Sequence, residues 1–449
     1  MSKSKRERGL FELYQDDPER ADALVFGRRT KIGRRGFVKG AGLATMGAVV
    51  GGAIPFSANM PAGLIPQALA QQAPAAGKAP AKPKTLEMQG KAGLIVLEER
   101  PLNCETPAHL LDDDVTPTAN MYIRNNGIPP EPTADPDKWQ ITIDGEVNTP
   151  LKLTLGELKK RFANVTLKLQ LECGGNGRSF FVPEARGNQW GHGAAGQPEW
   201  TGVRLRDVLN AAGLKPNAVY TAHYGADQHL SGDPKRTPLS RGVRLVKAME
   251  QHSLIVFAMN GKPLHIMHGF PVRLVVPGWS GSASQKWLTR IWIRDKEHDG
   301  PGMTGTSYRL TNVPMVPGAK HDPKNMQILE AMPMRSLITN VADGTELPAG
   351  TRDLALRGHA WAGEKKIAAM HVSIDYGQTW TSAEVAPPVN KYAWQNWRVN
   401  LRLPSHGYFE LWSRATDNAG HMQPHVAPNW NPSGYGGNPF HRVAVLVKA

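Results

Sequence analysis

Cysteine is scarce in this sequence, and its scarcity excludes several kinds of protein. The 449 residues contain only two cysteines, Cys104 and Cys173. Two cysteines cannot build a disulfide framework or a cysteine-rich metal site. No Cys-x-x-Cys-His segment occurs, so we expect no covalently attached haem in this chain.

Dense basic segments and long apolar runs are also missing. The net charge is +14, but no run of lysine and arginine is interleaved with aromatic residues. We therefore expect no nucleic-acid partner and attribute the excess to a general attraction for anions. The apolar stretch at 40–56 is short and rich in glycine, whereas spanning a bilayer takes roughly 20 apolar residues. We expect no stable membrane insertion.

The N-terminal region has the features of an export signal. Arg34 and Arg35 form a twin-arginine pattern, a weakly apolar stretch follows, and residues 68–70 offer a small-residue cleavage site. This pattern predicts a twin-arginine signal peptide at 1–70 and residence in the periplasm. Because that route exports folded proteins, a cofactor would be inserted before export. Residues 71–92, rich in alanine, proline and lysine, are expected to be a disordered linker.

The remainder divides into two regions with different patterns. Residues 93–325 mix apolar runs typical of strands with short helical patterns near 155–162 and within 200–213. This mixture predicts an α+β domain with mixed sheets. Residues 326–449 show only short strands separated by turns, which predicts an all-β sandwich of the immunoglobulin type.

The most informative stretch is 169–181, LQLECGGNGRSFF. It alternates apolar and polar residues up to Cys173 and then enters a turn rich in glycine and asparagine, which tolerate left-handed backbone. Arg178 follows five residues later, and a nearby cation favours the thiolate that binds metals. A lone cysteine is more often a buried structural residue, but the turn and the cation favour a functional thiol.

Further loops of the first domain add cations and polar groups: Arg124, Asp227, His268, Arg273 and Lys286. Each alone is more often a solvated or turn residue. Together with one thiol and glycine-rich backbone, they suit an anionic, phosphate-bearing cofactor with a thiolate-bound metal.

In combination these motifs resemble the sulfite oxidase family of molybdopterin oxidoreductases, from residue 108 to the C-terminus. The pattern Cys-x-Gly-Asn-x-Arg is its most specific motif, here Cys173, Gly175, Asn176 and Arg178. Ile123-Arg124-Asn125, the segment 268–273 (HGFPVR), Lys286-Trp287 and the segment 200–209 match as well.

The resemblance implies a sulfite-oxidase-type molybdopterin domain followed by a β-sandwich dimerisation domain. Cys173 would be the protein ligand of molybdenum. Arg124 and Arg178, with Trp190 nearby, would line a catalytic pocket for the oxyanion. The residues implied to hold molybdopterin and its phosphate are Tyr122, Arg124, Asn125, Asn126, Cys173, Asp227, His268, Arg273, Ser284 and Lys286.

Three positions depart from the family pattern. Asn126 stands where the family has a histidine, Leu239 where it has an active-site tyrosine, and Ser433 where a third arginine is expected. Arg236 or Arg241 would be the candidates to replace the lost positive charge.

The resemblance implies a periplasmic sulfite dehydrogenase, or a dehydrogenase of a related sulfur compound of the sulfane dehydrogenase type. Its substrate would be sulfite or another small sulfur oxyanion, and its electron acceptor an external c-type cytochrome. The chain would form a homodimer or a complex with a cytochrome subunit. Two alternatives stay open: a periplasmic sulfoxide reductase on the same scaffold, and a non-catalytic exported binding module.

Overall fold

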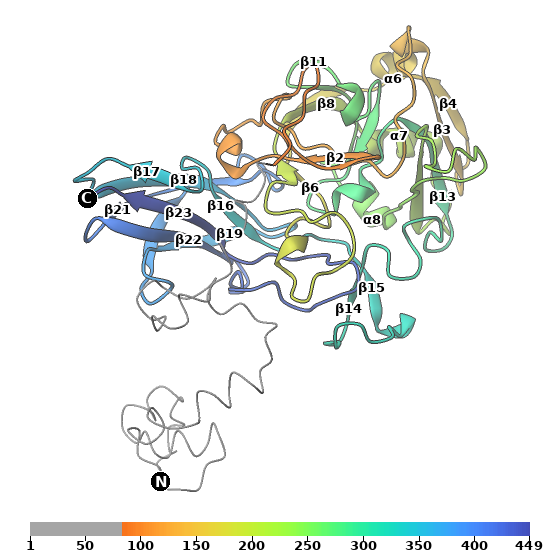
Figure 1. Ribbon diagram of the computed structural model, residues 1–449. Helices are drawn as coiled ribbons and strands as arrows, with labels where there is room; N and C mark the ends of the chain where they lie inside the picture. The colour runs from red at the N-terminus through yellow and green to blue at the C-terminus, as the bar shows by residue number, and fades with distance from the viewer. Residues whose placement is uncertain (1–82) are drawn as a thin grey trace, which may run out of the picture. The chain divides into compact units, whose positions relative to one another are not determined.

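The computed structural model describes residues 83–449 (Figure 1). The twin-arginine pattern, the cleavage site at 68–70 and most of the expected linker lie outside these residues. In the part of the chain that is described, no helix is long and apolar enough to cross a membrane.

Residues 83–92, which we expected in the linker, pack against the first domain. The N–H of Leu86 donates to the carbonyl of Leu94 at 2.8 Å. Lys91 is only 8% exposed, and its Nζ donates to the carbonyls of Thr118 and Met121 at 2.6 and 2.8 Å. The disorder expected at 71–92 therefore does not extend over these ten residues, because tertiary contacts made by Lys91 outweigh the local composition.

The first domain contains a four-stranded mixed sheet. Its strand order is β4 (Leu151–Thr154), β3 (Gln140–Gly145), β13 (Leu288–Arg294) and β9 (Tyr220–Gly225). β3 and β13 are parallel and the other neighbours are antiparallel. Ile141 and Ile143 are both fully buried, as the period-two alternation of a strand requires.

A second sheet is antiparallel throughout. It consists of β11 (Lys262–Pro263), β10 (Leu254–Met259), β8 (Glu199–Arg204) and β5 (Asn164–Lys168), with β12 (Arg273–Val275) also paired to β10. Residues 200–204 are thus strand, and the helix expected within 200–213 starts after them.

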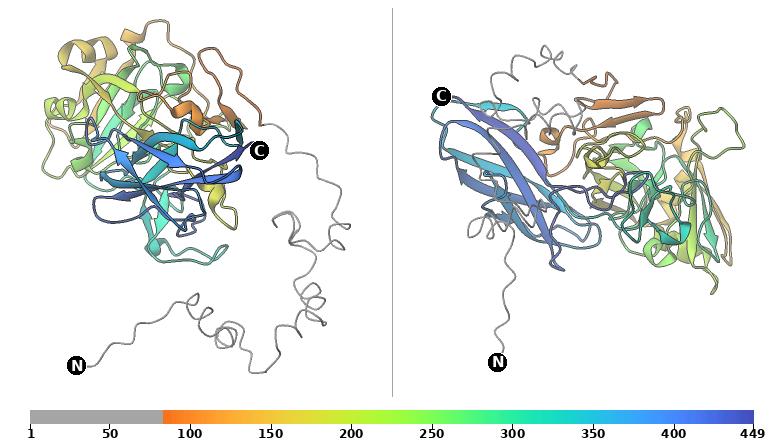
Figure 2. Two further views of the ribbon diagram at one scale, coloured as in Figure 1. Left: turned by 90° about the vertical axis from the view of Figure 1, so that its left-hand side faces the viewer. Right: turned by 60° about the horizontal axis from the view of Figure 1, so that its bottom comes forward.

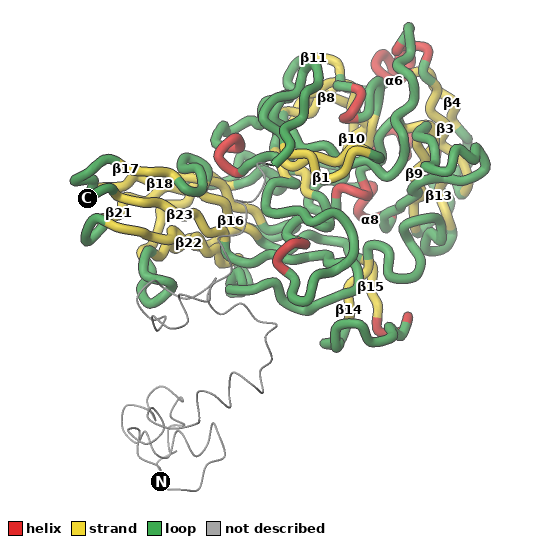
Figure 3. The backbone as a smooth tube through the Cα atoms, in the orientation of Figure 1, coloured by secondary structure: helices red, strands yellow, loops and turns green. Residues whose placement is uncertain are grey.

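The α-helices are few and short (Figure 3). They are α6 (Leu155–Arg161), α7 (Leu205–Ala212) and α8 (Leu245–Ala248). Thr154 and Glu157 form a capping box that starts α6, and Gly213, with φ at +68°, ends α7. Both expected helices are present. Short helices with mixed and antiparallel sheets make this an α+β domain, as predicted.

Short two-stranded pairs complete this region. They are β1 (Ile95–Glu99) with β2 (Leu102–Glu105), β6 (Leu171–Glu172) with β7 (Ala195–Gly196), and β14 (Arg309–Thr311) with β15 (Met326–Ile328).

The second region is all-β, as predicted (Figure 2). Eight strands follow the order β16 (Arg335–Ile338), β18 (Asp353–Trp361), β21 (Gln395–Arg402), β20 (Thr381–Val385), β19 (Ile367–Ser373), β22 (Gly407–Asp417), β23 (His441–Val447) and β17 (Thr345–Leu347). Leu354 and Leu356 of β18, and Val443, Val445 and Val447 of β23, point into one apolar core. Hydrogen bonds join the strands in a single series, so the two-layered immunoglobulin-like sandwich stays a prediction.

Candidate functional site

Cys173 lies at the end of β6, where the chain makes a tight turn. Its N–H donates to the carbonyl of Ala194, and its own carbonyl accepts from the N–H of Asn176, both at 2.9 Å. Gly177 has φ at +84°, a left-handed value that side chains rarely allow. The thiol residue is 6% exposed. The strand and the turn, with the thiol at their junction, are as the sequence predicts.

A buried ion pair from the all-β region fixes the residue before the thiol. Nε of Arg335 donates to Oε1 of Glu172 at 2.8 Å, and these side chains are 0% and 1% exposed. Oε1 also accepts from the Asn176 amide at 2.9 Å, and Oε2 accepts from the Trp361 indole at 2.7 Å. Both carboxylate oxygens are therefore satisfied, and the Cys173 turn is tied to the second region.

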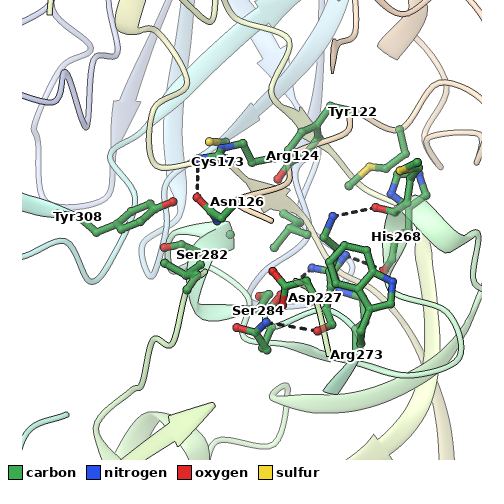
Figure 4. A pocket seen from close by; sticks show the side chains of 18 residues that line it. Tyr122, Arg124, Asn126, Cys173, Asp227, His268, Arg273, Ser282, Ser284 and Tyr308 are labelled. Carbon is green, nitrogen blue, oxygen red and sulfur yellow. Dashed lines mark hydrogen bonds between the residues drawn. The ribbon is translucent and has the colours of Figure 1, made fainter. Parts of the chain in front are cut away.

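Beside the thiol is a pocket whose wall is rich in cations (Figure 4). Arg124, Arg273 and Lys286 line it, with Asp227 as its carboxylate. The cations donate to neutral oxygens instead of to acidic groups. Arg273 donates to the carbonyls of His268 and Ser284 at 3.1 and 2.9 Å, and Lys286 to that of Met267 at 2.9 Å. Within residues 83–449 none of the three cations forms an ion pair.

Burial shifts the titration of these groups. It lowers the pKa of Arg273 to about 10 and that of Lys286 well below its usual range, and the neighbouring Arg273 lowers Lys286 further. Burial also raises the pKa of Asp227 to about 6, although Lys286 opposes that shift. A bound anion would stabilise both cations, so the pocket is built for a negatively charged ligand.

His268 is held by a lysine that the sequence did not single out. Nζ of Lys91 lies 2.7 Å from Nε2 of His268, and both side chains are buried. A protonated lysine can only donate, so Nε2 then accepts and the ring carries its hydrogen on Nδ1. Burial lowers the pKa of Lys91 to about 7. No motif marks Lys91, because it reaches the site from the segment we expected to be a linker.

Asn125 and Ser284 accept hydrogen bonds from the cations of the pocket. Asn125 is 1% exposed, and its Oδ1 accepts from Nζ of Lys286. Ser284 lines the pocket, its carbonyl accepts from Arg273, and its Oγ accepts from the N–H of Val276 at 2.9 Å. Both residues were expected at the cofactor.

Arg124 lies at the thiol end of the pocket. Its Nη2 donates to Oδ1 of Asn126 at 2.7 Å. Burial opposes its charge, but the neighbouring Tyr308 and Cys173 keep the pKa of Arg124 above its usual value. Asn126, which stands where the family has a histidine, therefore orients this guanidinium.

Tyr122 lines the pocket, whereas Trp190 lies behind it. The two rings meet edge-on with centroids 6.3 Å apart. Trp190 is fully buried. Burial raises the pKa of Tyr122 well above its usual range, and the charge of Cys173 adds to this shift. Trp190 thus packs against Tyr122 and does not itself line the pocket.

Arg178, expected in the oxyanion pocket, is not among the residues that line it. Its Nε donates to the carbonyl of Ser433 at 2.7 Å and its Nη1 to that of Asn188 at 2.9 Å. These carbonyls turn the guanidinium toward the loop between β22 and β23, where it lies 5.3 Å from the ring centroid of Tyr435. Arg178 therefore joins the Cys173 turn to the all-β region.

The departure from the family pattern at position 239 lies in the pocket wall. Leu239 is 8% exposed and lines the pocket, and Tyr308 lines it as well. Of the two arginines considered as substitutes, Arg236 is exposed and Arg241 is fully buried. Tyr308 was missed because it stands in an irregular segment whose position depends on the whole fold.

The donor set fits an anionic cofactor with a thiolate-bound metal. In residues 83–449 no group of three or more histidine, cysteine and acidic side chains could hold a metal ion. A metal beside Cys173 would therefore take one ligand from the protein and its others from the cofactor. Three cations that line the same pocket as the thiol, and that form no ion pair within residues 83–449, suit a phosphate-bearing molecule.

Comparisons with known proteins agree with this chemistry. Residues 127–302 match the family model of the oxidoreductase molybdopterin binding domain, and residues 326–448 match that of the Mo-co oxidoreductase dimerisation domain. The chain is 31% identical to sulfite oxidase of Gallus gallus over 388 residues, covering 84% of this chain and 81% of that protein.

Two mitochondrial sulfite oxidases and one solved structure are also similar. The Drosophila melanogaster protein is 31% identical over 81% of this chain, and the human protein 33% identical over 79%. The chain spans 65% and 66% of their lengths. The crystal structure of the sulfane dehydrogenase SoxCD from Paracoccus pantotrophus superposes with a TM-score of 0.65 at 25% identity, covering 86% of this chain and all of that one.

Proposed function

The chain belongs to the sulfite oxidase family of molybdopterin oxidoreductases, and from that membership we propose that it is a periplasmic, molybdenum-dependent sulfite dehydrogenase. The observation that carries the proposal is the placement of Cys173 in one pocket with a buried cation, Arg273, and two half-buried cations, Arg124 and Lys286. Within residues 83–449 none of these three cations forms an ion pair. The reaction converts sulfite and water into sulfate, two protons and two electrons.

The chain's own residues would hold the cofactor at three points. Cys173 supplies the thiolate ligand. The end for the phosphate consists of the cations Arg273 and Lys286 and the neutral His268. The space between is lined by Tyr122, Asn126, Asp227 and Ser284. Bound there, the molybdenum cofactor supplies oxygen-atom transfer and two-electron redox chemistry. Arg124, next to the thiol, would bind the substrate oxyanion through charge-assisted hydrogen bonds.

Location and partners form the next part of the proposal. The twin-arginine pattern at Arg34 and Arg35 supports export to the periplasm. There the electrons would pass one at a time to a c-type cytochrome. The match of 326–448 to a dimerisation domain supports a homodimer. A complex with a cytochrome subunit is the alternative assembly.

Oxidation of a sulfane-type sulfur compound is the second candidate. It is favoured by Leu239, which replaces a polar phenol with an apolar side chain in the pocket wall. The similarity to a sulfane dehydrogenase supports it as well.

Activity of the purified, molybdenum-loaded protein tests both candidates. Sulfite should reduce ferricyanide or cytochrome c with the formation of sulfate. Activity with thiosulfate-derived sulfane sulfur and none with sulfite would favour the second candidate. Oxidation of a reduced dye by a sulfoxide, without sulfite activity, would instead favour the reductase, and a protein that binds no molybdenum would be a binding module.

Export has its own test. Replacing Arg34 and Arg35 by lysine should retain the protein in the cytoplasm, and fractionation of the cells measures this. Unchanged periplasmic levels of the variant would contradict the twin-arginine interpretation.

A further inference from the structure

The chain before β1 contacts two histidine rings beside the pocket. One of them, His268, ends the 3-10 helix η6 (Ile266–His268) and lines the pocket (Figure 4). The other, His265, precedes η6, and its Nε2 lies 3.2 Å from the carbonyl of Gln89. Two residues further on, Nζ of Lys91 lies 2.7 Å from Nε2 of His268. One short segment therefore holds both rings.

The charged Lys91 has an acceptor for each of its three N–H groups. Nζ donates to the carbonyls of Thr118 and Met121 at 2.6 and 2.8 Å, and Nε2 of His268 is the third acceptor. The residue is 8% exposed, and it forms no ion pair with the residues that the structure describes. Because a buried charge with only neutral partners is costly, an anion nearby would stabilise it.

The contacts give the two rings opposite tautomers. The N–H of Met267 donates to Nδ1 of His265 at 3.2 Å, so this ring carries its hydrogen on Nε2 and donates it to Gln89. In His268 the charged Lys91 donates to Nε2, which leaves the hydrogen on Nδ1. Burial lowers the pKa of His268 well below its usual range, and the charge of Lys91 lowers it further, so this ring is neutral.

The hydrogen on Nδ1 of His268 is available to a ligand. Nδ1 forms no hydrogen bond within residues 83–449, although the ring lines the pocket. The alternative arrangement is a neutral Lys91 that accepts a hydrogen bond from Nε2 of the ring. It would leave a lone pair on Nδ1, which repels an anion. A bound anion therefore selects the charged lysine and the Nδ1–H tautomer together.

We infer that Lys91 is a positioning residue of the cofactor site, which fixes His268 in the neutral tautomer that donates from Nδ1 to a phosphate oxygen. The chain before β1 thereby becomes part of that site. Lys91 is not among the residues that line the pocket, so it acts through His268. The inference rests on the proposed function only for the identity of the anion as the phosphate of the cofactor.

The ring nitrogens of the parent protein give the first test. The full chain is made without molybdopterin, with isotopically labelled histidine, and is saturated with inorganic phosphate. NMR spectroscopy reports which ring nitrogen carries the hydrogen, and the loss of a signal in His268→Asn assigns His268. We expect His268 to be neutral with its hydrogen on Nδ1, and His265 to be neutral with its hydrogen on Nε2. A His268 ring with its hydrogen on Nε2, or with both nitrogens protonated, would overturn the inference.

The affinity of the same apoprotein for phosphate, measured by calorimetry, gives the second test. Lys91→Met should weaken phosphate binding about tenfold, because an oriented hydrogen bond to a charged group is lost. Lys91→Arg keeps a charged donor and should restore part of that affinity. Lys84→Met removes a lysine of the same segment whose side chain is 67% exposed, and it should match the parent. Parental affinity in Lys91→Met would overturn the inference.

A double-mutant cycle separates positioning from a merely structural role. His268→Asn keeps an amide donor but has no ring for Lys91 to orient, so adding Lys91→Met to it should change the phosphate affinity little. A lysine that only anchors the segment would lower the affinity equally in both backgrounds, and that result would overturn the assignment. The signal of His265 shows in each variant whether the segment is still docked.

Retention of the cofactor connects these results to the holoenzyme. During dialysis, loaded Lys91→Met should lose molybdopterin faster than the parent and Lys84→Met. Equal retention would overturn the link to the cofactor. None of these measurements depends on what the holoenzyme oxidises. If the loaded parent oxidised no sulfite, the proposed function would fail, and the tautomer of His268 and the phosphate affinities would still decide the role of Lys91.

Discussion

The thiol of Cys173 is distinguished from that of Cys104 by its surroundings. Cys104 lies in an apolar cluster with Leu94 and Ile123, where burial raises its pKa to about 11. Cys173 ends its strand at a pocket that also contains Arg124. The first environment keeps a thiol inert. The second places the thiol at the wall of a pocket, where a metal could reach it.

Replacing Cys173 by serine should abolish turnover while the protein still folds. A serine hydroxyl has nearly the size of the thiol but is a poor substitute for a thiolate ligand. We expect activity to fall at least 100-fold, measured as sulfite-dependent ferricyanide reduction per molybdenum. Cys104→Ala is the matched control and should keep both molybdenum and activity. Parental turnover in the serine variant would show that Cys173 is not the ligand.

Asp227 should make the apoprotein less stable as pH rises. Its folded-state pKa of about 6 exceeds the ordinary value of 3.8, so the folded state binds this proton more tightly than the unfolded state. The stability contributed by Asp227 is then complete below pH 3.8 and is lost as pH rises to about 6. At pH 7 the ionised carboxylate should destabilise the fold by on the order of 3 kcal/mol, at about 1.4 kcal/mol per pKa unit.

Urea unfolding of the apoprotein checks this expectation. Asp227→Asn should raise the free energy of unfolding at pH 7 and leave it nearly unchanged near pH 3.8. Asp113→Asn, at an exposed position, should change it by less than about 0.5 kcal/mol at either pH. An equal effect of Asp227→Asn at both pH values would contradict the pKa shift.

At the scale of elements, the Cys173 turn depends on β16 of the all-β region. The Arg335 side chain extends from β16, and its Nε donates to the carboxylate of Glu172. Its Nη2 also donates to the carbonyl of Asn176 within the turn at 3.0 Å. Removing one partner of a buried ion pair leaves the other charge uncompensated.

Arg335→Met should therefore destabilise the protein by about 3–5 kcal/mol. The matched control is Arg398→Met, which removes an ion pair with Glu384 whose side chains are 74% and 67% exposed. That variant should lose less than about 1 kcal/mol. Both are measured by urea unfolding, and equal losses in the two variants would show that the buried pair is not what holds the turn.

The elements that the sequence predicted have local signals. The strand before Cys173 follows from a period of two and the turn from glycine and asparagine, while α6 follows from its capping residues. The placement of Arg178 could not be predicted, because one of the carbonyls that direct it, that of Ser433, lies 255 residues along the chain.

Tyr308 and Lys91 illustrate the same limit. Neither lies in a recognisable motif, and each enters the site through the packing of an irregular segment. Comparison with the family pattern pointed to Leu239 as a pocket residue, and Leu239 does line the pocket. The sequence alone could not show that Tyr308 lines the same pocket. Family motifs thus predicted many of the residues that line the pocket, while the positions of Tyr308 and Lys91 required the tertiary structure.

At the scale of the whole molecule, the apoprotein should be stabilised by anions. Burial lowers the pKa of both Arg273 and Lys286, and the charge of Arg273 lowers that of Lys286 further. A bound anion offsets that penalty. A ligand that binds only the folded state at 100 times its Kd stabilises it by about 2.7 kcal/mol. Inorganic phosphate should do so for apoprotein made without molybdopterin, as measured by urea unfolding.

Sodium chloride at the same ionic strength separates a specific site from screening, because screening depends on ionic strength and not on the identity of the anion. Phosphate should exceed chloride in the parent apoprotein. Lys286→Met removes one of the cations that would bind the phosphate, so the excess should shrink in that variant, and it should also shrink in the loaded holoenzyme, where the pocket is filled. Lys262→Met, at an exposed position of β11, should leave the excess unchanged. Equal stabilisation by phosphate and chloride in the parent would show that the buried cations do not form an anion site.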